Sequence, residues 1–216
     1  MESIMQALDN FANQVTDFSE IKDHICFKLI NTAKNQEMLE EIPHVEYNDL
    51  SVIFYILIEQ DNDRTATTMV KNNLAECWRV DAASLYDLAL KNTPSLLGGE
   101  ICSIAQMLSE CGCDFIEENE QMFPMYIATN KRKMHGAGVI LYPGFLRKFA
   151  NLMNDDFYIL PSSIHECIFI PATIVDDAEC LKSMVPAVNQ SQILPHEVLS
   201  DNVYFYRRKD DSVTIV

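Results

Sequence analysis

The apolar segment at residues 52–58 constrains the fold more than any other part of the chain. Its seven consecutive residues are β-branched, aromatic or leucine, and polar residues flank it at 48–49 and 61–63. A run this short and this rich in such residues predicts a strand that is buried on both faces. Residues 65–70 are expected to form its antiparallel partner.

Helices are predicted where apolar residues recur at spacings of three and four. One helix is expected from residue 17, where a capping box stands, to about residue 40. Its apolar face consists of Phe18, Ile21, Ile25 and Leu29. Four more helices are expected at residues 81–89, 101–112, 143–153 and 176–188. Their predicted buried positions include Leu152, Met184 and Val188.

Strands dominate the prediction for the second half. They are expected at residues 125–129, 137–142, 157–160 and 164–170, and as a hairpin of residues 203–206 and 212–216. The protein is therefore predicted to be α+β, with a helix-rich acidic amino-terminal lobe and a mixed or antiparallel sheet with packed helices. The acidic stretch at 114–120 divides residues 1–120 from residues 121–216, as two lobes or within one continuous domain.

The charge of the chain is negative and unevenly distributed. There are 32 acidic and 16 basic residues, which gives a formal net charge of −16. Residues 1–120 contain 22 acidic and seven basic residues, whereas residues 121–216 contain ten and nine. Nucleic-acid binding depends on Lys and Arg, so the acidic half argues against direct contact with nucleic acid. The same charge suits solubility, or docking on the basic surface of a protein partner.

Seven cysteines at scattered spacings indicate free thiols. No secretory signal follows Met1 and no apolar run of about 18 residues is present, so we expect a cytoplasmic protein without a membrane span. Cys102, Cys111 and Cys113 come nearest to a metal cluster. Structural zinc sites take four ligands, usually in pairs spaced by two to four residues. One ligand is missing here, and we predict neither a metal nor another cofactor.

Ser162, His165 and Glu166 are weak catalytic candidates because they lie close together in the sequence. In a strand, however, neighbouring side chains face opposite sides, and a catalytic triad needs groups that converge in space. The alternative is a turn in which serine hydroxyls bind backbone groups. If the protein is an enzyme, its site is expected around Asn130, Tyr142, Ser162, Ser163, His165 and Glu166.

Binding residues are predicted in the acidic segments and near the basic turn at residues 130–136. We expect the charges of this turn to be solvated. The alternatives are that they bind an anion or that they pair with the acidic half of the chain. The binding candidates are Asp61, Asp63, Glu117, Glu118, Glu120, Asn130, Lys131, Tyr142 and Ser163.

The string Leu-Pro-Ser-Ser-Ile-His-Glu at residues 160–166 is the most specific of several segments, spread over roughly residues 18–206, that look familiar. Together they resemble an uncharacterised bacterial family, domain-of-unknown-function family 5688. The resemblance implies no known activity, but it implies a setting near mobile elements. By analogy, such a setting favours host-defence inhibitors, several of which are small acidic proteins that occupy the basic channel of a nuclease.

Two functions follow from these observations. The first is a non-enzymatic, acidic protein-binding module of a mobile element or phage, such as an anti-CRISPR-like inhibitor that mimics nucleic acid. The second is an enzyme of unrecognised type with a polar site around Ser162, His165 and Glu166. The uneven charge favours the first, because electrostatic steering speeds docking on a basic surface.

Overall fold

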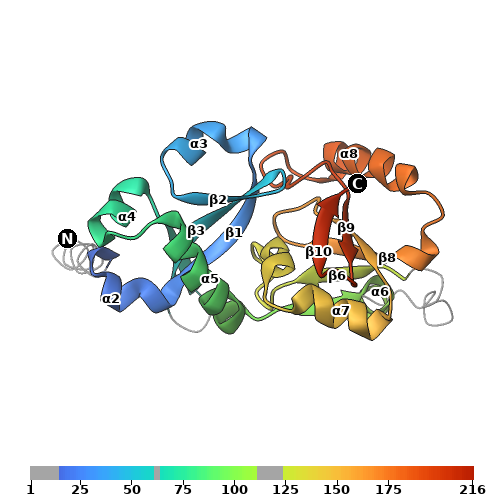
Figure 1. Ribbon diagram of the computed structural model, residues 1–216, viewed down its shortest axis with the longest axis horizontal. Helices are drawn as coiled ribbons and strands as arrows, with labels where there is room; N and C mark the ends of the chain where they lie inside the picture. Colours follow the sequence, from blue (N-terminus) through green and yellow to red (C-terminus); the bar gives the residue numbers. More distant parts are fainter. Residues whose placement is uncertain (1–14, 61–63, 111–123) are drawn as a thin grey trace.

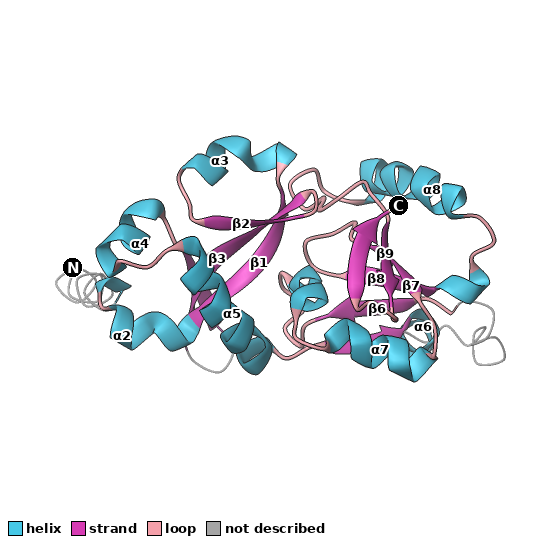
Figure 2. Cartoon of the chain, in the orientation of Figure 1, coloured by secondary structure: helices cyan, strands magenta, loops and turns pink. Residues whose placement is uncertain are grey.

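Two antiparallel sheets flanked by helices lie side by side along the long axis of the protein (Figure 1). The computed structural model describes residues 15–60, 64–110 and 124–216. Figure 2 shows helices around both sheets, with α5 beside the first and α7 and α8 beside the second. The α+β class predicted from the sequence is therefore confirmed.

The first sheet is built around strand β3 (Leu50–Gln60). It also contains β1 (Ile25–Asn31), β2 (His44–Tyr47) and β4 (Arg64–Met69). Strand β1 pairs with one edge of β3, while β2 and β4 pair with successive halves of the other edge. Residues 50–57 are buried because partner strands shield both edges and side chains cover both faces. The buried strand predicted at 52–58 and its pairing with residues 65–70 are confirmed.

The helix predicted from residue 17 to about residue 40 is wrong beyond its first turn. Asp17 does cap a helix, α2 (Phe18–Ile21), by accepting a hydrogen bond from the Ser19 amide. After one 3₁₀ turn the chain runs as β1, which pairs residue by residue with β3. Ile25 and Leu29 are four residues apart, and this spacing places side chains on one face of a strand as well as of a helix.

Short helices and one long helix flank the first sheet. They are α3 (Gln36–Glu40), α4 (Asn72–Trp78) and α5 (Ala82–Leu97), with the 3₁₀ turns η1 (Lys22–His24) and η2 (Ala33–Asn35). Asp81 caps α5 by accepting a hydrogen bond from the Ser84 amide, which confirms the predicted helix start. Helix α5 packs on β1 and buries Leu85 and Ala89.

The helix predicted at residues 101–112 starts later than expected. The chain first forms β5 (Glu100–Ser103), which pairs with β6 (Tyr126–Thr129), and only then α6 (Ile104–Glu110). Pairing with β6 holds Ile101 in extended conformation, and such tertiary context overrides local helical spacing. The predicted helix end at Gly112 and the acidic stretch at 114–120 lie outside the described residues.

The second sheet is antiparallel, with the strand order β10-β9-β7-β8-β6-β5. Its remaining strands are β7 (Phe157–Leu160), β8 (Cys167–Pro171), β9 (Tyr204–Arg207) and β10 (Ser212–Ile215). The strands predicted at 125–129 and 157–160 and the tail hairpin are confirmed. The strand predicted at 164–170 begins only at Cys167, and ahead of it Ser163 forms an isolated bridge with Val198.

Residues 137–142 do not form the predicted strand. They belong mostly to a 3₁₀ helix, η3 (Gly136–Leu141), which packs against β1 and β6. Residues 136–140 of this helix are all buried. A short apolar run that is buried on every side fits a strand and a helical segment equally well, so periodicity could not distinguish them.

Helix α7 (Phe145–Met153) forms where it is predicted, but two details differ. Pro143 precedes the N-cap, Gly144, instead of occupying the first helical position. Leu152 was expected on the buried face, yet it is 81% exposed. The buried face of α7 consists of Leu146, Phe149 and Ala150.

Helix α8 (Ala178–Gln192) begins at the predicted cap, where Asp177 accepts a hydrogen bond from the Glu179 amide. A 3₁₀ turn, η4 (Ala172–Ile174), precedes it. Met184 and Val188 were expected to be buried but are exposed. The buried face contains Leu181, Val185 and Asn189 instead. None of the helices in the described ranges is both long and apolar enough to cross a membrane.

One hydrophobic core extends across both sheets. It includes Phe27 and Phe54 of the first sheet, Val139 of η3, and Phe169 and Tyr206 of the second. Polar contacts also join the two sheets, since the Asn31 side chain donates a hydrogen bond to the Leu199 carbonyl at 2.9 Å. The turn after β6 lies at this junction and positions the site described next.

Candidate polar site between the two sheets

The turn that follows β6 is held by a buried asparagine. The Asn130 side chain accepts a hydrogen bond from the Arg132 amide at 3.0 Å and donates one to the Met134 carbonyl at 2.8 Å. The Lys131 amide donates to the Leu97 carbonyl at 3.1 Å, which fixes the turn to the end of α5. Asn130, a predicted binding residue, is fully buried and shapes the turn from within.

Two histidines stack at the end of this turn. The rings of His135 and His165 are nearly parallel, with centroids 5.7 Å apart. The backbone amide of His135 donates a hydrogen bond to Nδ1 of His165 at 3.3 Å. The Thr129 hydroxyl donates to the His165 carbonyl at 2.8 Å, so the end of β6 holds both histidine segments together.

Glu197 lies on the far side of His165, with Oε1 3.4 Å from Nε2 of the ring. Because Nδ1 accepts a hydrogen bond from the His135 amide, neutral His165 carries its proton on Nε2 and directs it toward Glu197. The Glu197 carbonyl accepts a hydrogen bond from the Ile164 amide at 2.9 Å. Both ring nitrogens of His165 are therefore already engaged.

Lys28 and Tyr55 of the first sheet lie on the other side of His135. Lys28 Nζ is 3.4 Å from Nε2 of His135, and the Tyr55 ring meets the imidazole edge-on at a centroid distance of 6.2 Å. Both side chains project from one face of the sheet, because Tyr55 pairs with Cys26, two residues before Lys28. Burial lowers the pKa of His135 to about 4, and the charges of Lys28 and His165 act in the same direction.

The catalytic candidates do not converge on one point. The Ser163 hydroxyl accepts a hydrogen bond from the His165 amide at 3.0 Å, as in the predicted turn. The Ser162 carbonyl accepts one from the Leu199 amide at 3.0 Å. Within the described residues, neither serine hydroxyl hydrogen-bonds to the His165 ring, and the carboxylate beside the ring belongs to Glu197 and not to the candidate Glu166.

Two of the remaining binding candidates, Tyr142 and Lys131, have contacts with residues other than the histidines. Tyr142 is buried against Phe27, with ring centroids 6.0 Å apart. Lys131 is exposed, and its aliphatic stem passes close to Gly98. The predicted acidic binding residues Asp61, Asp63, Glu117, Glu118 and Glu120 lie outside the described residues, as do Cys111 and Cys113.

Sequence reasoning missed Lys28 and Glu197. Lys28 carried a usable signal, because it is the one charged residue in the apolar stretch from Ile25 to Ile30. A lysine at such a position is rarely buried without a specific contact. Glu197 carried no comparable signal, since only the tertiary fold brings its loop to His165.

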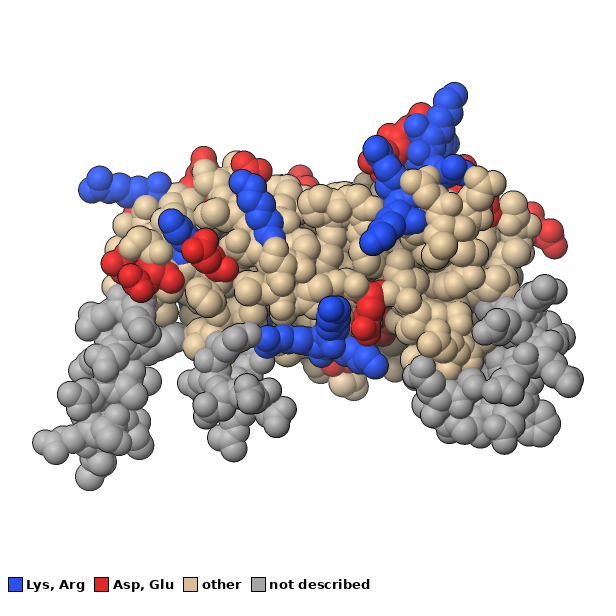
Figure 3. All heavy atoms as spheres, turned by 90° about the horizontal axis from the view of Figure 1, so that it is seen from below, with Lys and Arg blue, Asp and Glu red and all other residues tan. Residues whose placement is uncertain are grey.

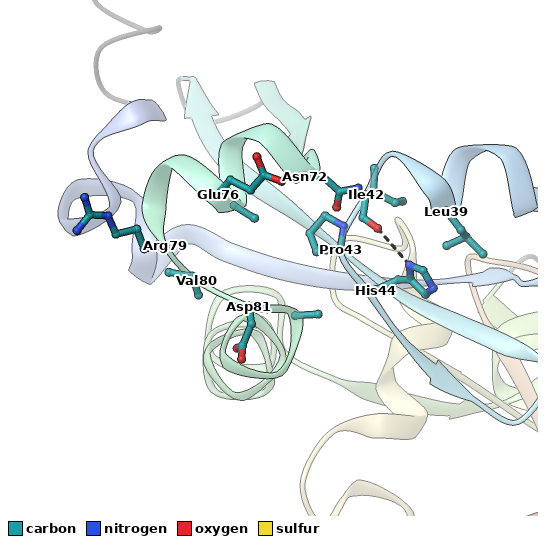
Figure 4. A pocket seen from close by; sticks show the side chains of 11 residues that line it. Leu39, Ile42, Pro43, His44, Asn72, Glu76, Arg79, Val80 and Asp81 are labelled. Carbon is teal, nitrogen blue, oxygen red and sulfur yellow. Dashed lines mark hydrogen bonds between the residues drawn. The ribbon is translucent and has the colours of Figure 1, made fainter.

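A second feature is a pocket of about 640 Å³ at the far end of the first sheet. Residues from α3, β2, α4 and the start of α5 line it. They are Leu39, Ile42, Pro43, His44, Asn72, Ala75, Glu76, Arg79, Val80, Asp81 and Ala82. Figure 4 shows Arg79 at one end of this pocket and Leu39 and His44 at the other. Its lining is partly apolar, with Leu39, Ile42 and Ala75, while Glu76 and Asp81 give it acidic groups and Arg79 gives it a basic one.

The unusual pKa of His135 predicts a loss of stability in mild acid. Its pKa is about 4 in the folded chain and 6.5 in an unfolded one, so between these values only the unfolded chain binds the proton. The contribution of His135 to the free energy of unfolding is fully present above pH 6.5 and is lost as the pH falls toward 4. We expect the free energy of unfolding to fall by about 1–2 kcal/mol, after allowance for solvent screening. Urea unfolding at pH 7 and at pH 4.5 measures it.

The matched variants are His135→Asn and His24→Asn. Asn tolerates the left-handed conformation of residue 135, so His135→Asn should flatten the pH dependence while preserving the turn. His24 is exposed and its replacement should leave the dependence unchanged. Equal pH dependence in both variants would contradict this origin of the effect.

The sequence model of one protein family, described as a family of unknown function (DUF5688), matches residues 1–208 of the chain. No curated protein and no solved structure matches the chain.

Proposed function

Because the chain belongs to DUF5688, a family of unknown function, we propose its role from its own surface. We propose that it is a non-enzymatic protein-binding module whose acidic first half docks on the basic surface of a protein partner. The partner class that best fits an acidic mimic of nucleic acid is a nuclease with a basic channel, such as a host-defence nuclease. The chain would then serve a bacterial mobile element or phage as an anti-CRISPR-like inhibitor.

One observation carries this proposal: most of the carboxylates that the structure describes in the first half are exposed and form no ion pair. Ten of them are exposed on described residues, against five exposed lysines and arginines. They are Asp17, Glu20, Asp23, Glu37, Glu40, Glu41, Glu46, Glu76, Asp81 and Asp87. In the described part of the chain, Glu41 alone among them forms an ion pair, with Lys71 at 3.2 Å.

The pocket between α3 and α4 supports a specific docking area. Glu37 and Glu40 of α3 and Glu76 of α4 stand on the helices that border it, and Asp81 lines it. Apolar lining residues beside two carboxylates, with Arg79 as the one Lys or Arg side chain among the described lining residues, suit an inserted basic side chain, whose aliphatic stem packs on the apolar residues while its charge reaches Glu76 and Asp81. On the face seen in Figure 3, by contrast, charged side chains form scattered groups among uncharged surface.

The enzyme alternative around Ser162, His165 and Glu166 has less support. General base catalysis needs an imidazole nitrogen within reach of the proton that it takes. Both nitrogens of His165 are engaged, by the His135 amide and by Glu197. We also propose a cytoplasmic location, which the free thiols of Cys26, Cys77, Cys167 and Cys180 support.

Charge reversal on α3 and α4 tests the docking area. The variant carries Glu37→Lys, Glu40→Lys and Glu76→Lys, and we expect its affinity for the partner to fall by roughly a hundredfold, because each reversal replaces attraction with repulsion. The partner is captured from host lysate with the wild-type protein, identified by mass spectrometry, purified, and titrated by calorimetry. The three side chains are exposed, so the folded state should persist.

The matched control changes the same charge in the second half. Asp176→Lys, Glu179→Lys and Asp210→Lys alter exposed residues whose ion pairs, where present, contribute little to stability. This control should retain nearly full affinity. An equal loss in both triple variants would indicate a response to net charge alone and would contradict a defined acidic docking area.

A further inference from the structure

A pocket of about 670 Å³ lies beside β5, the last strand in the order of the second sheet. Its described lining residues come from the start of β5, from β6 and from helices α6 and α7. The apolar and aromatic ones are Ile101, Tyr126, Phe145, Phe149 and Leu152. A pocket of this size and lining, with a few polar groups at its border, is typical of a site for a small molecule.

The aromatic side of this pocket is preformed. Phe149 is buried, and its ring packs against those of Tyr126 and Phe157 at centroid distances of 5.1 and 4.9 Å. Phe145 lies against the start of β5, where a Cβ atom on Gly99 would come within 2.7 Å of its ring. Rings packed this closely do not readily turn, so the wall that they form is in place before a ligand arrives.

The pleat of β5 decides which of its side chains face α7. Ser103 pairs with Tyr126, whose ring packs on that of a phenylalanine of α7. The Cβ position of Gly99 points at another ring of the same helix. Side chains alternate along a strand, so Ile101 shares this face, whereas the side chain of Glu100 leaves from the opposite face. The carboxylate of Glu100 therefore starts on the side of the sheet that faces away from α7.

Helix α7 gives the pocket its positive charge. Phe145, Lys148 and Leu152 are spaced by three and four residues, which places them on one side of the helix. Lys148 is exposed, and within the described residues its ammonium forms no ion pair. The side-chain oxygen of Asn151 accepts a hydrogen bond from Nε of Arg208 at 3.1 Å, which leaves its two amide hydrogens as donors. Donors beside positive charge suit an anionic group.

We propose that this pocket binds a small carboxylate with an apolar body. The body would pack on the aromatic rings and cover Leu152, whose side chain is 81% exposed. The carboxylate would accept charge-assisted hydrogen bonds from the Lys148 ammonium and from the Asn151 amide group. A single ammonium matches the single charge of a carboxylate better than the two charges of a phosphate monoester. The site is independent of the acidic docking area on α3 and α4.

The charge of the second half permits such a ligand. Residues 121–216 contain ten acidic and nine basic residues, so an anion meets little repulsion from this half of the chain. The excess of carboxylates lies in the first half, and at physiological salt exposed charges more than about 8 Å away are largely screened.

The test is an NMR titration of the ¹⁵N-labelled full chain with sodium phenylacetate, sodium octanoate and the uncharged phenylacetamide. We expect the backbone amides of β5 and α7 to shift and saturate with at least one carboxylate, at a dissociation constant below roughly 5 mM. Phenylacetamide should bind at least about fivefold more weakly than phenylacetate, because it lacks the charge that pairs with Lys148.

Three variants of exposed residues assign the recognition to this pocket. Lys148→Met keeps the aliphatic stem, and it should weaken binding of the carboxylates by roughly fivefold or more while phenylacetamide is little affected. Leu152→Gln keeps a good helix former, and it should weaken all three probes several-fold because it removes apolar contact. Lys91→Met, on the exposed face of α5, should leave every affinity unchanged.

Each outcome decides the proposal. Tighter binding of phenylacetate indicates an aromatic carboxylate, and tighter binding of octanoate an aliphatic one. No saturable shift up to roughly 20 mM of either carboxylate would overturn the site. Equal affinity for phenylacetate and phenylacetamide, or unchanged carboxylate affinity in Lys148→Met, would overturn recognition of the carboxylate. If the spectrum of Lys148→Met shows an unfolded chain, unchanged affinity in Leu152→Gln would overturn the site in its place.

Discussion

Replacing Gly136 with alanine is expected to destabilise the fold by about 3 kcal/mol or more. A Cβ atom at this position would lie 2.1 Å from the Thr129 hydroxyl oxygen, 2.4 Å from the His165 carbonyl oxygen and 2.7 Å from the Asn130 amide nitrogen. Two of these atoms belong to the backbone, so no change of rotamer removes the overlap. The turn would have to move away from His165, which separates the His135 amide from Nδ1 of His165.

Gly144→Ala is the matched control for this prediction. Gly144 has a positive φ of 71°, but nothing lies within 4 Å of an added Cβ, so only backbone strain opposes the change. We expect a cost of about 1 kcal/mol. Chemical unfolding in urea at neutral pH measures both variants. If Gly136→Ala costs no more than Gly144→Ala, the close approach of the turn to β6 and His165 is contradicted.

Removing the Asp49 carboxylate is expected to cost about 3 kcal/mol, because it would leave buried donors without an acceptor. Asp49 lies between β2 and β3 of the first sheet. It accepts hydrogen bonds from the Ser200 hydroxyl at 2.7 Å, from the Asn202 side chain at 3.0 Å and from the Tyr204 hydroxyl. Ser200 and Tyr204 are fully buried, so water cannot replace the lost acceptor without local opening.

Asp49→Ala is compared with Glu46→Ala and with Asp49→Asn. Glu46 is exposed on β2, and its replacement should change the free energy of unfolding by less than about 0.5 kcal/mol. Asp49→Asn keeps one acceptor oxygen, so its loss of free energy of unfolding should lie between those of Asp49→Ala and Glu46→Ala. Urea unfolding again provides the measurement. An Asp49→Ala variant as stable as Glu46→Ala would show that this network does not hold the second sheet to the first.

The sequence predicted the elements whose signals are local. The buried strand β3, the caps at Asp81 and Asp177 and the tail hairpin all depend on residues within a few positions of one another. The errors fall where tertiary pairing decides between two conformations. Ile25 and Leu29 satisfy the spacing of both a strand and a helix, and pairing with β3 selects the strand. Residues 136–140 of the glycine-containing run at 136–141 are all buried, so the run carries no periodic signal.

The polar site was only partly predictable for the same reason. His165 was identified because it stands in a polar stretch, and it does belong to the site. Its partners come from three other parts of the chain: Lys28 from β1, His135 from the turn after β6, and Glu197 from the loop after α8. Lys28 could have been found as a lone charge in an apolar strand, whereas no local feature marks Glu197.

The salt dependence of partner binding tests the central proposal most directly. The measurement is the dissociation constant of the complex with the captured partner, determined by calorimetry between about 50 and about 500 mM NaCl. Docking through exposed carboxylates predicts that affinity falls by roughly tenfold or more over this range, because salt screens exposed charges. An affinity that stays constant from low to high salt would contradict docking through the acidic first half.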